Sequence, residues 1–258
     1  MIKFSKDIYI NDCFRNWVEY DNIFIISDPH FNDPDMKYLR NDISADEIVD
    51  KINSVVHKRD ILIVLGDIGD VSYVSKLKAG YKVLVKGNHD AGESKYRRQI
   101  TSKEISAYET NSDFETVKRP REDVIASAKS YPNFVSIKEC YDFVGLNCYN
   151  ATYDNRLFDE IYDVLSLSDK IIMTHEPIDI NPKCMLNIHG HIHSSTYVED
   201  MYHLCVSAER IDYTPIRLKD VIESGRLSKI ETLHRDTIDK ATERRIKRGY
   251  RFGRKDEI

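Results

Sequence analysis

Short apolar runs recur along this chain, and each of them ends at polar residues. The clearest is Ile61–Leu65, where five apolar residues follow one another before Gly66 and Asp67. A strand buried on both faces has this pattern, because neither face meets water. Similar runs occur at Ile23–Ile26, Tyr81–Val85, Lys170–Met173, Met185–Ile188 and His203–Val206. The pattern therefore predicts a set of buried strands.

A helix is predicted over Ser44–His57, between the strands expected at Ile23–Ile26 and Ile61–Leu65. Ser44 and Glu47 fit a capping box at its N-terminus, and Ile48 and Ile52 fall on one face. A strand, a helix and a strand in this order imply a parallel pair with a right-handed crossover. We therefore expect an α/β fold, a four-layer α/β/β/α sandwich of two mixed sheets flanked by helices.

The remaining segments are less regular. A short helix is expected over Val71–Ala79, and the second sheet is expected to include strands at Asn133–Ile137, Asp142–Cys148 and Phe158–Leu165. We expect one domain over residues 1–216, with a helical or looped insertion at 91–132 over the strand ends. Residues 217–258 are expected to form a charged helical C-terminal extension with a basic tail, which by default is solvated.

Composition excludes several classes of protein. The chain is 41% hydrophobic and 31% charged with a net charge of −5, so its overall charge does not favour nucleic-acid binding. No apolar run approaches the roughly 18 residues that would span a bilayer, and the first residues lack a signal-peptide core. Five cysteines without CxxC spacing indicate reduced, structural thiols. We expect a cytoplasmic protein with no membrane partner; its oligomeric state does not follow from the sequence.

The predicted strands end in groups that bind metal ions. The carboxyl ends of strands in an open α/β sheet are where ligands bind, so these groups are expected at one edge. A single histidine or aspartate there would mean little, but five strand ends of this kind in one chain are hard to ascribe to chance. The groups are Asp28 and His30, Asp67, Asn88 and His89, His175, and His191 and His193.

This mixture of carboxylate, amide and imidazole groups suits Mn, Fe or Zn, and the absence of thiolate argues against a structural zinc site. Without His89, the set comprises two carboxylates, one amide oxygen and four imidazoles. These seven ligands are too many for one catalytic ion, which typically takes about three and keeps a position open. Two ions that share one bridging carboxylate fit the number.

The ordered motifs DPH, GDIGD, GNHD, TH and GHIH resemble those of the calcineurin-like metallophosphoesterases, which run DxH, GDxxD, GNH(D/E), H and GHxH. The resemblance covers about residues 20 to 216 and is greatest to small phage and bacterial members. Those members often have Gly-His after the first motif, where this chain has Asn32 and Asp33. The departure concerns the substrate-facing rim and no metal ligand.

The resemblance implies a role for each motif residue. The first metal ion would be held by Asp28, His30, Asp67 and His193, and the second by Asp67, Asn88, His175 and His191, with Asp67 bridging. His89 matches the catalytic histidine of the family, and Asp70 matches the acid that orients it. The family's chemistry implies two divalent metal ions, for which we expect Mn²⁺, with Fe, Zn and Ni as alternatives.

We therefore expect a metal-dependent phosphoric ester hydrolase that acts on phosphomonoesters or phosphodiesters, with a nucleotide among the candidate substrates. A metal-bridging hydroxide would attack, and His89 would act as general acid. The alternatives are a nuclease or a protein phosphatase of the same fold, or a catalytically silent scaffold that binds proteins. The protein phosphatases fit less well, because Val71 and Ser72 stand where they have Arg-Gly. Silent scaffolds typically lose ligands, whereas this chain keeps them all.

Overall fold

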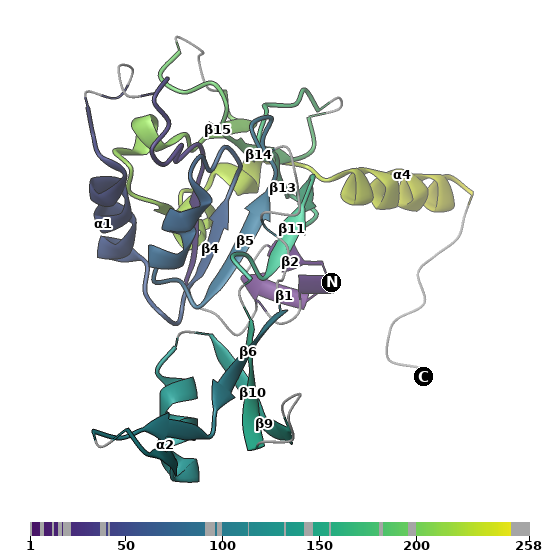
Figure 1. The fold of residues 1–258 in the computed structure, drawn as a ribbon. Helices are drawn as coiled ribbons and strands as arrows, with labels where there is room; N and C mark the ends of the chain where they lie inside the picture. Colours follow the sequence, from purple (N-terminus) through teal and green to yellow (C-terminus); the bar gives the residue numbers. More distant parts are fainter. Residues whose placement is uncertain are drawn as a thin grey trace. The chain divides into compact units, whose positions relative to one another are not determined.

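The chain forms two compact units, which are described separately (Figure 1). The first unit comprises Met1–Gly92 and Glu160–Ile258, and the second comprises Glu93–Asp159. The computed structural model describes residues 2–5, 8–11, 13–14, 17, 22–36, 40, 42–90, 96, 100–112, 114–131, 133–141, 147–154, 156–180, 183–195 and 200–248. The backbone of all these residues is described, although some side chains in helices and strands are not.

The first sheet of the first unit has the strand order β11-β5-β4-β3-β16. Strands β3, β4, β5 and β11 run parallel, and β16 closes one edge antiparallel to β3. Ile23 pairs with Ile61, which pairs with Tyr81. The bounds are β3 (Ile23–Ile26), β4 (Ile61–Val64), β5 (Tyr81–Val85), β11 (Glu160–Tyr162) and β16 (Ile216–Arg217).

The second sheet has the order β12-β13-β14-β15. Strands β13, β14 and β15 are parallel, and β12 is antiparallel to β13. The bounds are β12 (Leu165–Ser166), β13 (Ile171–Met173), β14 (Leu186–His189) and β15 (His203–Cys205). Both sheets are thus mixed, as the sequence predicts.

One hydrophobic core joins the two sheets. Alternate residues of each strand point to the same face, and the inner positions of both sheets belong to a single buried cluster. The first sheet contributes Ile23, Ile25, Ile61, Ile63, Val83 and Val85, and the second contributes Leu165, Ile171, Met173, Leu186 and Ile188. The expected sandwich of two mixed sheets with helices is confirmed, although the helices are few.

Helix α1 (Ala45–Val55) forms with the predicted capping box, since the Ser44 side chain accepts from the Glu47 backbone and Glu47 accepts from the Ser44 backbone. Figure 1 shows α1 at the left of the first unit. The expected helix over Val71–Ala79 is a shorter 3₁₀ helix, η3 (Val71–Lys76), which Asp70 caps by accepting from the Ser72 N–H. Runs of 3₁₀ helix are short because their hydrogen bonds are poorly aligned.

The C-terminal segment begins with α3 (Leu218–Glu223) and the 3₁₀ helix η6 (Arg226–Lys229). Both contribute to the main core through Leu218, Val221 and Leu227. Helix α4 (Leu233–Lys247) follows. Among the helices in the described part of the chain, none is long and apolar enough to cross a membrane.

The second unit corrects one expectation. Of the strands expected in the second sheet, Phe158–Leu165 contains β11, which joins the first sheet, and residues 142–146 of Asp142–Cys148 lie outside the described residues. The strand at Asn133–Ile137 corresponds to β9 (Phe134–Tyr141), which pairs with β10 (Asn147–Asp154). Since β10 also pairs with β6 (Ile100–Ser106), β9 and β10 belong to a separate antiparallel sheet. Their sequence alternates, so Tyr149 and Ala151 bury one face against α2 (Arg121–Lys129). An alternating pattern predicts a strand, but it does not identify the partner strand.

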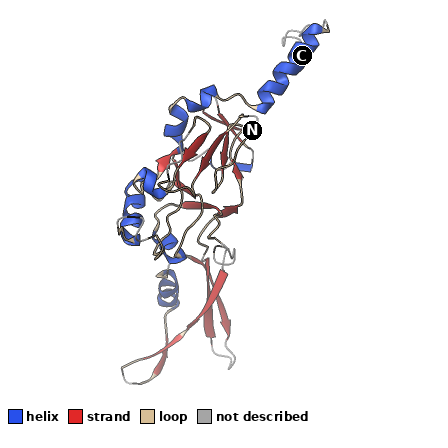
Figure 2. Cartoon of the chain, turned by 90° about the horizontal axis from the view of Figure 1, so that it is seen from above, coloured by secondary structure: helices blue, strands red, loops and turns tan. Residues whose placement is uncertain are grey.

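A small hairpin, β7 (Tyr108–Thr110) and β8 (Thr116–Lys118), completes the second unit. Figure 2 shows the strands of the second unit in red and its helix α2 in blue. The unit therefore extends beyond the 91–132 insertion that the sequence indicates. Another hairpin, β1 (Ile2–Ser5) and β2 (Ile8–Ile10), belongs to the first unit.

Candidate metal centre

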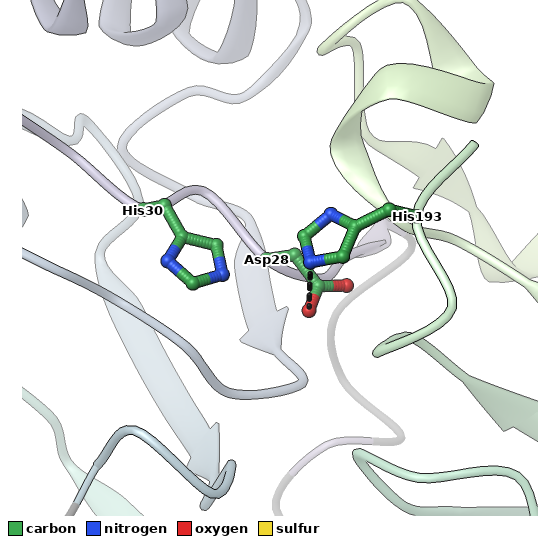
Figure 3. Close-up of side chains that lie close together, drawn as sticks. All are labelled: Asp28, His30 and His193. Carbon is green, nitrogen blue, oxygen red and sulfur yellow. Dashed lines mark ion pairs between the residues drawn. The ribbon is translucent and has the colours of Figure 1, made fainter. Parts of the chain in front are cut away.

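Asp28, His30 and His193 form one cluster at the strand ends (Figure 3). One ligand atom of each lies within 4.8 Å of the others. Asp28 and His30 follow β3, and His193 follows β14. His193 Nε2 lies 4.0 Å from Asp28 Oδ1, and the rings of His30 and His193 are 5.3 Å apart.

Asp67, His175 and His191 form a second cluster with the same spacing. Asn88 joins it, because its Oδ1 atom lies 2.8 Å from His175 Nε2 and 3.1 Å from His191 Nδ1. These two nitrogen atoms are 3.1 Å apart. Four side chains from four separate loops therefore direct ligand atoms to one point.

One oxygen atom lies next to both clusters. Asp67 Oδ2 is 3.4 Å from His30 Nε2 and 3.3 Å from His175 Nε2. The other oxygen, Oδ1, accepts the backbone N–H of His89 at 2.9 Å. Asp67 thus stands between the clusters, at the position that a bridging carboxylate requires.

Five of these residues have a left-handed backbone. The φ angles are 56° for Asp28, 38° for His30, 53° for Asp67, 67° for His191 and 46° for His193. Residues other than glycine seldom adopt positive φ, and such conformations concentrate at functional sites, where the surrounding structure holds them. The turns after β3, β4 and β14 therefore place side chains at the expense of local backbone strain.

Two glycines allow the loops to approach each other. A Cβ atom on Gly190 would lie 1.8 Å from Ser27 Oγ and 2.4 Å from Asp28 Oδ2. A Cβ atom on Gly87 would lie 2.3 Å from Asp67 Oδ1. Both positions need glycine because the loops that carry the two clusters leave no room for a side chain.

Each of three cluster histidines has its second ring nitrogen held by an acceptor. His30 Nδ1 contacts Asp33 Oδ2 at 2.8 Å, and His175 Nδ1 contacts the Leu65 carbonyl oxygen at 2.8 Å. His193 Nδ1 lies 3.2 Å from both carboxylate oxygens of Glu209. Such outer contacts orient metal-ligating imidazoles and fix which nitrogen faces the ion.

Arg40 and Glu209 form a buried support that the sequence did not reveal. Arg40 Nε donates to Glu209 Oε1 at 2.5 Å, and its other nitrogens donate to the carbonyl oxygens of Pro29 at 2.7 Å and Asp28 at 2.5 Å. Arg40 thereby links the loop after β3 to the carboxylate that contacts His193. Glu209 lies in the 3₁₀ helix η5 (Ala208–Ile211). Neither Glu209 nor Arg40 belongs to a motif or to a periodic pattern in the sequence, so no sequence signal identifies them.

Asp90 supports the bridging turn in a similar way. Its Oδ2 atom accepts the backbone N–H groups of Asp67 and Gly87, each at 2.8 Å, and its Oδ1 atom accepts that of Ile68 at 3.2 Å. Its place in the GNHD motif was visible in the sequence, but this structural role was not.

The charges of the clusters shift several pKa values. Burial alone would raise the pKa of Asp67, but the imidazoles of His175 and His30, whose Nε2 atoms lie 3.3 Å and 3.4 Å from its Oδ2 atom, lower it far below its usual range. Burial alone would lower the pKa of His175, but the Asp67 hydrogen bond and the charge of Asp28 raise it to about 9. The pKa of His30 is raised for the same reason, by Asp67 and Asp33 against the effect of burial. The carboxylates therefore favour positive charge at this edge.

The residues present fit a divalent cation. The buried Nε2 atom of His30 forms no hydrogen bond of good geometry within the described residues, so its ring presents a nitrogen to the space beside Asp67. Carboxylate, amide and imidazole donors converge there without thiolate, which is a donor set for Mn, Fe or Zn. Such an ion would neutralise the clustered carboxylates.

His89 and Asp70 lie near the clusters but are not bonded to each other. The His89 side chain is exposed, and its ring lies 5.5 Å from that of His30. Asp70 instead accepts from the Ser72 N–H at 3.0 Å and from Asn32 Nδ2 at 3.3 Å. Asp33 is the acid whose pKa the charge of His89 helps to lower, after the larger effects of burial, which raises it, and of its bond to His30.

Comparison with known protein families identifies the family of this chain. A family model described as calcineurin-like phosphoesterase matches residues 22–198, which is more than half of the 258 residues. The chain therefore belongs to the calcineurin-like phosphoesterase family. A search of curated proteins gave no significant match. Among solved structures, a protein of unknown function from Aquifex aeolicus matches 78% of this chain and 98% of its own, at 20% identity and a TM-score of 0.44.

Proposed function

We propose that this chain is a dinuclear metal-dependent phosphoesterase that hydrolyses phosphomonoesters or phosphodiesters. The observation that carries the proposal is the placement of Asp67 Oδ2 within 3.4 Å of a histidine nitrogen from each cluster. One ion would be held by Asp28, His30, Asp67 and His193, and the other by Asp67, Asn88, His175 and His191. We favour Mn²⁺, with Fe, Zn and Ni as alternatives.

Two divalent ions bound there supply a water molecule of lowered pKa and neutralise negative charge on the phosphoryl group. The chain's own part is to hold the ligands rigidly and to deliver a proton. Arg40, Glu209, Asp33 and Asp90 keep the ligands in place through the contacts described above. A preorganised site of this kind spends little free energy on rearrangement during the reaction.

His89 is the proposed general acid. Its backbone is fixed to Asp67 Oδ1, while its exposed ring faces solvent beside His30. A protonated imidazole there can donate to the leaving oxygen of a phosphate ester. Asp70 and Asp33 are the proposed positioning residues for this ring, since catalytic hydrogen bonds often tighten only when substrate is bound.

A cavity of about 430 Å³ adjoins His30 and would accept the organic part of the ester. Its apolar wall includes Met36, Ile43 and Ile48, and its polar wall includes Asn32 and Asp33. This volume lies within the range of small-molecule sites, about 300–1,000 Å³. An apolar surface beside a hydrogen-bond acceptor suits a nucleoside, so we favour a nucleotide as substrate.

The direct test is turnover of the Mn²⁺-loaded protein on aryl phosphate monoesters and diesters, nucleotides and short oligonucleotides. His89→Ala is expected to lower kcat by about 10²- to 10⁴-fold while metal content stays unchanged. His57→Ala is the matched control, because this exposed histidine belongs to neither cluster and its Nδ1 atom lies 3.0 Å from the Val55 carbonyl oxygen and 3.6 Å from Asp60 Oδ2.

Two results would contradict the proposal. Absence of turnover on every substrate with two ions bound would favour a non-catalytic scaffold. Turnover unaffected by Asp67→Asn would remove the bridging assignment.

A further inference from the structure

Two cysteines face each other across neighbouring strands of the second unit. Cys140 in β9 and Cys148 in β10 are directly opposed in the antiparallel register, and their Sγ atoms lie 2.7 Å apart. Opposed residues of antiparallel strands have Cα atoms about 4.5–5.5 Å apart. A disulfide requires about 4.4–6.8 Å, so the two sulfur atoms can be joined with little movement of the backbone.

We propose that Cys140 and Cys148 are a site of reversible disulfide formation, oxidised by a small disulfide such as oxidised glutathione. The Cys140 thiolate attacks one glutathione sulfur and releases a first glutathione thiol. The Cys148 thiolate then attacks the Cys140 sulfur and releases a second. One S–S bond breaks and one forms, and two electrons and two protons pass from the cysteines to glutathione.

The order of attack follows from exposure. Cys140 is partly exposed, whereas Cys148 is 3% exposed. An exposed thiol meets the small disulfide first, and the buried thiol beside it resolves the mixed disulfide before a second glutathione can enter.

The new bond would leave the core of the second unit intact. Successive residues of a strand point to opposite faces, so Cys148 lies on the face opposite Tyr149. Tyr149 packs with Val124 of α2. Oxidation therefore fixes β9 to β10 without displacing the residues that pack on α2, and the inference does not depend on the proposed function of the metal centre.

The test uses the full chain in an oxidising glutathione buffer, followed by acid quenching, denaturation and alkylation. Trypsin leaves both cysteines in one peptide, residues 139–156. We expect this peptide to lack both alkyl groups and to be about 2 Da lighter than its unmodified reduced form, since a disulfide removes two hydrogens. Chymotryptic cleavage after Tyr141 should then give two peptides that stay joined until reduction.

Two variants test the order of attack and the specificity of the crosslink. Cys148→Ser should stop at the mixed disulfide and carry one glutathione on Cys140. Cys13→Ser is the matched control, because Cys13 is exposed and has no part in the proposed bond, so the crosslink should form as in the wild type. The proposal is overturned if both cysteines of the wild type are alkylated, if each carries its own glutathione, or if the crosslink joins another pair.

Discussion

The backbone N–H of His89 donates a hydrogen bond to Oδ1 of Asp67 at 2.9 Å. Because the other oxygen of that carboxylate stands between the two histidine clusters, the same side chain fixes the proposed general acid and joins the proposed metal sites. The position of the acid is therefore coupled to the position of the ions. Changes that loosen the support around Asp67 should affect metal binding and proton transfer together.

A substitution at Glu209 probes the contact that orients His193 in the first cluster. Glu209→Gln removes the negative charge that His193 Nδ1 and Arg40 share, so His193 loses part of its orientation. We expect Mn²⁺ affinity to fall by about 10- to 100-fold, measured by competition with a metal-sensitive dye. Glu223→Gln is the control, because Glu223 is exposed and lies 4.0 Å from Lys219; equal affinity in both variants would refute the role of Glu209.

A substitution at Gly190 probes the close approach of two loops that carry the candidate metal ligands. Gly190→Ala would force a Cβ against Ser27 and Asp28, and we expect a loss of about 3 kcal/mol in the free energy of unfolding, together with weaker Mn²⁺ binding. Gly225→Ala is the control, because Gly225 has a φ of 77° but nothing within 4 Å of the added Cβ. Its backbone strain should cost about 1–2 kcal/mol, with metal binding intact. Urea unfolding measures the loss of stability in both variants. Intact metal binding in Gly190→Ala would contradict the proposed role of this close approach.

A substitution at Ile43 probes whether the cavity beside His30 binds the organic part of the substrate. Ile43→Trp should fill part of the space, so the organic part of a nucleotide would be displaced. We expect KM for nucleotides to rise by about tenfold or more, while KM for a small alkyl phosphate stays the same. Steady-state kinetics on both substrates measure the difference. Equal effects on the two would show that the cavity does not hold the leaving group.

The lowered pKa of Asp200 predicts that the free energy of unfolding depends on pH, at a residue outside the two clusters. Burial alone would raise the pKa of Asp200, but hydrogen bonds from His203, the Tyr202 backbone and Lys183 together lower it to about 2. The contribution to stability is therefore present above the unfolded pKa of 3.8 and is lost as the pH falls toward 2. Since the Asp200 side chain is 41% exposed, solvent screening limits the effect to about 1 kcal/mol.

Asp200→Asn should accordingly be less stable than the wild type at pH 6, and the difference should shrink below pH 3.8. Urea unfolding at several pH values measures it. A difference that grows as the pH falls would reverse the sign that the hydrogen bonds predict.

The sequence predicted those features that local patterns encode. Ile61–Leu65 is apolar throughout and ends at Asp67, so both the buried strand and its terminal acid could be inferred. The clusters followed because parallel strands deliver their ends to one edge. Ser44 and Glu47 likewise predicted the start of α1, which the structure confirms.

Features that depend on tertiary contacts could not be predicted. Arg40 and Glu209 are 169 positions apart and meet only after folding. The alternation around Tyr149 indicates a strand of either sheet, and only the pairing with β6 and β9 places it in the second unit. The cysteines were expected to be reduced, structural thiols, and they are free in the structure. Their spacing in the sequence does not show that Cys140 and Cys148 lie opposite each other.

The most direct test of the central claim is an anomalous-scattering measurement on crystals of the Mn²⁺-loaded protein. We predict two anomalous peaks about 3.5–4 Å apart, with a carboxylate oxygen of Asp67 within coordination distance of both. A single peak, or two peaks of which Asp67 contacts one, would contradict it.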